Sequence, residues 1–189
     1  MSGDWQRHHL EPVRAIGAYV VYFSQLVLLM RGLVIRKLSP PEGPRTLAEL
    51  ALGEASAIQI ANAFFAICQE VGNLDETELR IGRSLRSQVL VVIERRNDIA
   101  HGDWWTGGLE PDMTISPSRL IRIKPARADG TRVEQSLTVA DLDQESRDLI
   151  NLQFAVIEFG NAALGFDPDR RVSDLFELDK KRAVRRARL

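Results

Sequence analysis

The chain's strongest constraint on its fold is an apolar segment near the N-terminus, because residues 15 to 30 carry no charge. Apolar residues recur three and four positions apart, which predicts a helix from about residue 11 to 38. They form two neighbouring stripes, one of Val13, Ile16, Val20, Phe23, Val27, Met30 and Val34 and the other of Tyr19, Tyr22, Leu26, Leu29 and Leu33. Such a helix must be covered on more than one side. A four-helix bundle would cover it, and a seam between two copies of the chain would do so more naturally.

We interpret this segment as a buried helix rather than a membrane span. Ser24 and Gln25 interrupt it, and Arg31 closes it short of the ~20 apolar residues that a membrane helix needs. Asp4 and Glu11 precede it, unlike the basic start of a signal peptide. We therefore expect a cytoplasmic protein that does not bind membranes. The single cysteine, Cys68, suits a reducing compartment.

Punctuation residues divide the rest of the chain into further elements. Pro40 and Pro41 end the first helix, and helical patterns follow from Thr46 to about Val71, from about 75 to 102, and from Asp141 to about 165. Between the last two, the apolar residues Leu120, Ile121 and Ile123 face Thr131, Val133 and Leu137 across an Asp129-Gly130 turn, which predicts a β-hairpin insertion over about residues 113–138. The predicted fold is mainly all-α, a bundle of four to five helices over residues 1–168 with this hairpin between the third and fourth long helices.

The charges are distributed unevenly along the chain. Residues 170–189 carry eight Lys/Arg against three Asp/Glu, a net +5, and residues 1–169 carry 17 against 23, a net −6. The acidic body is therefore not a nonspecific trap for DNA. We assign residues 169–189 to a basic C-terminal tail, which begins with a short helix around Val172 to Leu178 and could bind RNA or anionic lipid, although a solvated terminus is the commoner outcome. Three histidines without HExxH or CxxC spacing predict no metal and no cofactor.

Polar residues interrupt both apolar stripes of the third helix at its C-terminal end. Arg96 follows Val89 and Val92 on one stripe, and Asn97 and His101 follow Ile93 on the other. Because functional sites are where local patterning is violated, we expect this end to carry the function. A half-buried guanidinium requires a carboxylate, a partner subunit or an anionic ligand.

Arg96 and His101 together suit phosphodiester cleavage. Imidazole can move a proton near neutral pH, and a guanidinium can hold a phosphate through two hydrogen bonds. In RNA the 2′-OH is the nucleophile, so neither a catalytic serine nor a metal is needed. The two residues are about 140° apart on an ideal helix. A pocket shared by two copies of the chain is therefore favoured over a pocket within one.

The motif Arg96-Asn97-Asp98-Ile99-Ala100-His101 resembles the signature of the HEPN superfamily, an Arg followed four to six residues later by His, often with Asn after the Arg. The resemblance covers roughly residues 10–165. It implies a dimeric helical bundle and, in many members, a metal-independent endoribonuclease with toxin, antiviral defence or RNA-processing roles. It makes Arg96 and His101 the catalytic pair and Asn97 an orienting residue. Members paired with a nucleotidyltransferase antitoxin tend to carry a tyrosine two positions after the His, where this chain has Asp103.

Several neighbours of the motif complete the predicted site. Asp98 and Asp103 are expected to support the catalytic pair, and Arg95, Trp104 and Trp105 to bind substrate, the indoles by stacking on a base. RNA is the expected substrate, and an antitoxin or other protein is a possible partner of the homodimer. The alternative function is a non-catalytic bundle that binds a protein or nucleotide through the same groove. A purely structural interpretation is also open, in which Arg96 pairs with Glu94, Asp98 or a remote acid and the tryptophans cover a core.

Overall fold

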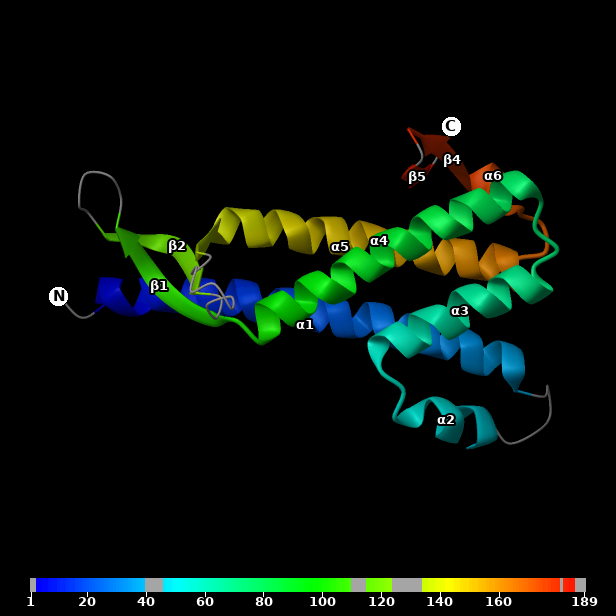
Figure 1. Ribbon diagram of the computed structural model, residues 1–189, viewed down its shortest axis with the longest axis horizontal. Coiled ribbons are helices and arrows are strands. Elements are labelled where there is room, and N and C mark those ends of the chain that lie inside the picture. Colours follow the sequence, from blue (N-terminus) through cyan, green and yellow to red (C-terminus); the bar gives the residue numbers. More distant parts are fainter. Residues whose placement is uncertain (1–2, 40–45, 110–114, 124–133, 181, 186–189) are drawn as a thin grey trace, which may run out of the picture. The chain divides into compact units, whose positions relative to one another are not determined.

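The computed structural model describes residues 3–39, 46–109, 115–123, 134–180 and 182–185 (Figure 1). Within them the fold is mainly α-helical, as the sequence predicted. The helices are α1 (Gly3–Leu38), α2 (Thr46–Gly53), α3 (Ala57–Val71), α4 (Glu76–Ala100), α5 (Val139–Ala163) and α6 (Val172–Leu175).

Capping boxes set where three of these helices begin. The side chain of Ser56 caps α3 and pairs reciprocally with Gln59, so the helical region predicted from Thr46 to Val71 is in fact two helices. Asp75 and Glu78 exchange the same bonds before α4. At α5, hydrogen bonds from the backbone N–H and hydroxyl of Thr138 lower the pKa of the Asp141 carboxyl.

The chain falls into two compact units. Unit 1 comprises Met1–Phe23 and Glu94–Leu149, and unit 2 comprises Ser24–Ile93 and Ile150–Leu189. The helices α1, α4 and α5 therefore each contribute residues to both units. The predicted motif lies in unit 1.

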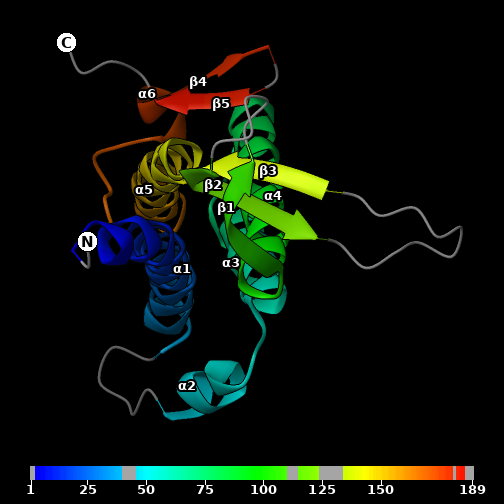
Figure 2. The ribbon, with the colours of Figure 1, turned by 90° about the vertical axis from the view of Figure 1, so that its left-hand side faces the viewer.

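A three-stranded antiparallel sheet lies in unit 1, in the order β1-β2-β3 (Figure 2). The strands are β1 (Asp103–Leu109), β2 (Ile115–Ile123) and β3 (Glu134–Thr138), and Leu120 of β2 pairs with Leu137 of β3. The sequence predicted only a hairpin here. It missed β1 because Gly107 and Gly108 indicate a loop, whereas the strand accommodates them at a register shift between Thr106 and Gly108. The Asp129-Gly130 turn lies outside the described residues.

The core of unit 2 consists of apolar residues from α1, α3, α4 and α5. A Cβ on Gly160 of α5 would lie 2.7 Å from Cδ1 of Leu33 and 3.0 Å from the ring of Phe64. This glycine therefore allows α5 to approach α1 and α3 closely within the unit. Phe64 and Phe159 are almost completely buried and meet edge to face.

The C-terminal segment through residue 185 is folded onto unit 2 rather than solvated. After α6, strands β4 (Phe176–Asp179) and β5 (Arg182–Arg185) form an antiparallel hairpin, and Phe176 is 1% exposed. The carboxylate of Glu78, at the start of α4, accepts hydrogen bonds from the Arg171 guanidinium and from the backbone and hydroxyl of Ser173. The sequence predicted only a short helix followed by a basic tail.

Helix α1 has a large apolar surface that the described residues do not cover. Its residues Leu10–Leu38 are long and apolar enough to cross a membrane by length and composition alone, and 28% of the most apolar window is buried. The buried side includes Tyr19 and Phe23 in unit 1 and Leu26 and Met30 in unit 2. Leu10, Val13, Val21 and Leu28 are each more than half exposed.

Candidate functional site

The last turn of α4 holds the predicted catalytic arginine in a half-buried position within unit 1. The Cζ atom of Arg96 lies 5.6 Å from the ring centroid of Phe23 on α1, within the range of a cation–π contact. Its Nη1 donates to Oδ1 of Asn97 over 3.2 Å. Its Nε is buried and has no hydrogen-bond partner, and no ion pair of Arg96 occurs within the described part of the chain. An unpaired, partly desolvated guanidinium of this kind favours an anionic ligand.

The predicted catalytic histidine follows the end of α4. His101 is exposed, and its backbone N–H donates to the carbonyl of Asn97 over 3.0 Å, which extends the helical hydrogen-bond pattern by one residue. Asn97 therefore bonds to Arg96 through its side chain and to His101 through its backbone. The bond to His101 joins backbone atoms, so it fixes the course of the chain and does not orient the imidazole.

Trp104 completes the end of α4 from the first strand. Its indole Nε1 donates to the carbonyl of Ile99 over 2.7 Å, satisfying one of the terminal carbonyl groups that the helix cannot pair internally. Ile99 is 1% exposed, so this bond fixes the helix end to β1 over a buried residue. This indole therefore has a structural contact at its nitrogen, and only its ring faces remain for stacking.

Arg95 is committed to a different partner. Its Nε and Nη2 donate to the two carboxylate oxygens of Glu145 on α5 over 2.8 and 2.7 Å. The hydrogen bonds from Arg95 to Glu145 raise the pKa of the guanidinium, and the charge of Asp98 adds to this effect. Arg95 therefore braces α4 against α5, with Asp98 in its electrostatic surroundings. The predicted roles of Arg95 in substrate binding and of Asp98 in support of the catalytic pair stay predictions.

Tyr19 of α1 lies within the electrostatic reach of this brace. Burial, and then the neighbouring charge of Glu145, raise the pKa of Tyr19 to about 12. Its hydroxyl therefore stays protonated at neutral pH. The sequence does not show that Glu145 is the partner of Arg95, that Phe23 contacts Arg96, or that Tyr19 lies near this pair. Contacts between distant helices leave no local signal in the sequence.

The remaining predicted residues lie on β1, where only the backbone is described for two of them. Asp103 pairs with Ile123 and Trp105 with Ile121 in the sheet register, and the orientation of both side chains lies outside the described part of the structure. Among the described residues, no group of three or more His, Cys, Asp or Glu side chains could hold a metal ion.

Comparisons of the chain with protein-family models, with curated proteins and with solved structures each find no match. The residues and geometry of this site are therefore the basis for any functional assignment.

Proposed function

We propose that the chain is a HEPN-like, metal-independent endoribonuclease that cleaves single-stranded or loop RNA as a cytoplasmic homodimer. The observation that carries the proposal is the half-buried guanidinium of Arg96, which has no carboxylate partner among the described residues and bonds to Asn97 beside the exposed His101. A toxin, defence or RNA-processing role with an antitoxin or other protein partner follows from the resemblance alone.

The reaction needs only groups that the motif and the RNA provide. The imidazole of His101 accepts the proton of the ribose 2′-OH, and the 2′ oxygen attacks the adjacent phosphorus. The bond from phosphorus to the 5′ oxygen breaks, and that oxygen takes up a proton from an imidazolium. Arg96 stabilises the charge that accumulates on the phosphoryl oxygens. The products are a 2′,3′-cyclic phosphate and a 5′-hydroxyl end.

A second copy of the chain would provide the second imidazole. Within unit 1, α1 exposes Leu10, Val13 and Val21, and a Cβ at Gly17 would meet no atom within 4 Å. These four positions lie three and four residues apart, so they form one helical face. The absent side chain at Gly17 would let another helix approach this face closely.

The decisive experiment is incubation of the pure protein with labelled single-stranded RNA in the presence of a chelator. We expect cleavage that leaves cyclic phosphate ends and that falls about 100-fold or more in Arg96→Ala and in His101→Ala. The matched control is Arg147→Ala, which removes an exposed arginine on α5. Absence of cleavage, or equal cleavage by wild type and both variants, would contradict the proposal.

The alternative is a non-catalytic bundle that uses the same residues to bind a nucleotide or a protein. The contacts of Arg96 with Asn97 and Phe23 would serve an anion-binding role equally well. RNA binding that is weakened by Arg96→Ala, without any cleavage by the wild type, would select this alternative.

A further inference from the structure

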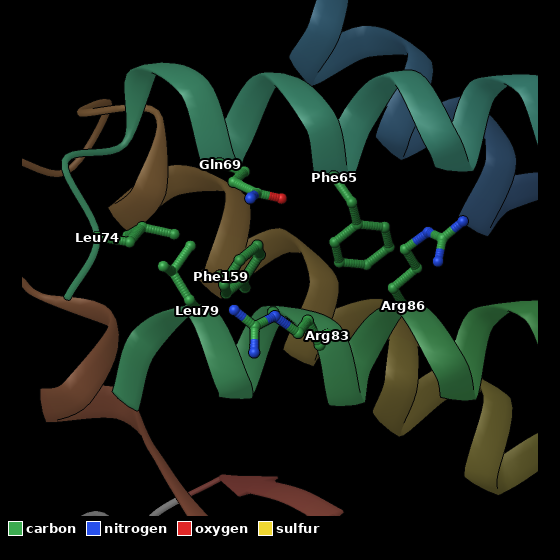
Figure 3. A pocket seen from close by; sticks show the side chains of 8 residues that line it. Phe65, Gln69, Leu74, Leu79, Arg83, Arg86 and Phe159 are labelled. Carbon is green, nitrogen blue, oxygen red and sulfur yellow. The ribbon is translucent and has the colours of Figure 1, made fainter. Parts of the chain in front are cut away.

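A small apolar notch lies between α3 and α4 in unit 2, which contains neither Arg96 nor His101 (Figure 3). Phe65, Leu74, Leu79 and Phe159 line it, and Gln69, Arg83 and Arg86 surround its mouth. Its volume is about 40 Å³, compared with the ~10–15 Å³ that a single water molecule needs by a similar measure. The notch therefore admits the tip of one side chain and is too small for a nucleobase.

The floor of the notch is a packed aromatic cluster. The ring centroids of Phe65 and Phe159 are 5.9 Å apart, and those of Phe64 and Phe65 are 4.9 Å apart. Gly82 of α4 keeps the floor open, because a Cβ there would lie 3.0 Å from Cζ of Phe159. The tip of an apolar side chain could therefore pack against this preformed floor with little rearrangement, which lowers the free-energy cost of binding.

The mouth is positively charged. Arg80, Arg83 and Arg86 recur every three residues on α4, and residues 79–93 contain no acidic residue, although residues 1–169 carry a net charge of −6. Arg83 pairs with Glu76 over 3.5 Å, but both side chains are more than 60% exposed, so this contact is weak. Arg86 donates to the neutral amide oxygen of Asn62 over 2.8 Å. Arg86 therefore has no carboxylate partner among the described residues, and the charge of Arg83 is only partly compensated by the exposed Glu76.

We propose that this notch docks an acidic peptide segment of a partner protein. One aliphatic or aromatic side chain of the peptide enters the notch, and flanking carboxylates bond to Arg83 and Arg86, which lie about one helical turn apart. The apolar floor favours a peptide over RNA, because phosphates could bond to the arginines but a nucleobase would not fit into the notch.

The experiment uses an array of immobilised 12-residue peptides of varied sequence, probed with the full chain. We expect retained peptides to combine Asp or Glu with one Leu, Met or Phe. Binding of a retained peptide should weaken about tenfold or more in Arg83→Glu/Arg86→Glu and in Gln69→Trp, which covers the mouth, and should weaken as salt increases. The matched control, Arg147→Glu/Arg170→Glu, makes the same charge change at exposed positions and should bind normally. Thermal unfolding of all variants checks that each is folded.

Two results would overturn the proposal. One is peptide binding that does not depend on charge: the retained peptides are not enriched in acidic residues, or they bind the charge-reversed variant as tightly as the wild type. The other is single-stranded RNA that loses affinity in Arg83→Glu/Arg86→Glu while no peptide binds, which would assign the arginines to nucleic acid. Neither result depends on cleavage of RNA, so this docking site and the nuclease proposal can fail independently.

Discussion

At the scale of residues, two adjacent arginines in one helical turn have different surroundings. Arg95 makes two hydrogen bonds to Glu145 and its side chain is 17% exposed. The hydrogen bond and the cation–π contact that Arg96 makes among the described residues are with Asn97 and the ring of Phe23, respectively. Removing one member of a partly buried ion pair is destabilising, so the carboxylate partner of Arg95 indicates a structural role. The lack of a carboxylate partner at Arg96 among the described residues supports its proposed role in binding an anion.

The Arg95–Glu145 pair should stabilise the fold without taking part in the reaction. We expect Glu145→Ala to lower the free energy of unfolding by about 2 kcal/mol, because it leaves a half-buried guanidinium without its carboxylate. Chemical denaturation measures this change. Removal of Glu76, whose pair with Arg83 is exposed, is the control and should cost less than about 0.5 kcal/mol.

A double-mutant cycle gives a second check on this assignment. Arg95→Ala and Glu145→Ala should cost much less together than the sum of the single changes, because each single variant leaves one group unpaired. RNA affinity that falls in Arg95→Ala while stability is unchanged would instead return Arg95 to the substrate site.

The sequence indicates candidate residues for the site but not the residues that they contact. Arg96, Asn97 and His101 stand out because they replace apolar residues on a helix, and this local signal is visible in one chain. That Arg95 pairs with Glu145, and that Trp104 bonds to Ile99, depends on which elements meet across the unit. Such contacts follow from tertiary packing, which the spacing of residues in one helix does not encode.

At the scale of elements, the C-terminal hairpin shows how a buried carboxylate can fix a basic segment. Glu78 is 1% exposed. Burial alone would raise its pKa, but hydrogen bonds from Arg171, from the backbone of Asp75 and from Ser173 outweigh this effect and lower the pKa below its ordinary value of 4.5. The ionised carboxylate therefore holds α6 and the hairpin that follows it against the start of α4.

This contact should make attachment of the hairpin depend on pH. A lowered pKa means that the folded protein binds the Glu78 proton less tightly than the unfolded chain does. Its contribution to stability is therefore complete above about pH 4.5 and is lost as the pH falls through the lowered value. We expect Glu78→Gln to destabilise the protein at neutral pH, and the difference from wild type to shrink as the pH falls below 4.5.

Hydrogen exchange of residues 172–185 provides the local measurement. It should speed up in Glu78→Gln at neutral pH while the core of α3 stays protected. Asp141→Asn is the control, because Asp141 also has a lowered pKa but belongs to unit 1. Equal exchange of this segment in wild type and Glu78→Gln would show that apolar contacts of Val172 and Phe176 hold it alone.

Helices were easier to predict than strands in this chain. The periodic apolar stripes placed α1, α4 and α5 within a few residues, except that α1 begins earlier than expected, at Gly3. The β4–β5 hairpin was missed because its strands are four residues each and rich in charge, and Phe176 had been placed on a short helix. Short strands carry too few alternations for a period of two to be recognised.

At the scale of the whole molecule, the described residues leave an apolar face of α1 exposed to solvent. Leu10, Val13 and Val21 are 65%, 63% and 55% exposed in unit 1. Single exposed apolar residues are normal, but a continuous apolar face along one helix marks an interaction site. The predicted offset between Arg96 and His101 is a separate reason to expect a second copy of the chain, although it does not locate that copy on α1.

Val21→Glu should therefore separate the proposed dimer into monomers. The charge would lie in the seam between two α1 helices, where it loses water without gaining a partner. Sedimentation at micromolar concentration should give twice the 21.2 kDa chain mass for wild type and the chain mass for the variant. Val91→Glu is the matched control, because this valine of α4 is 62% exposed and belongs to unit 2. RNA cleavage should fall in Val21→Glu and persist in Val91→Glu, because only the seam variant removes the second imidazole.

Two outcomes would contradict this interpretation of the α1 face. A monomeric wild type that cleaves RNA would exclude the shared pocket but not the nuclease activity. A wild type that binds lipid vesicles through α1 would assign this face to a membrane.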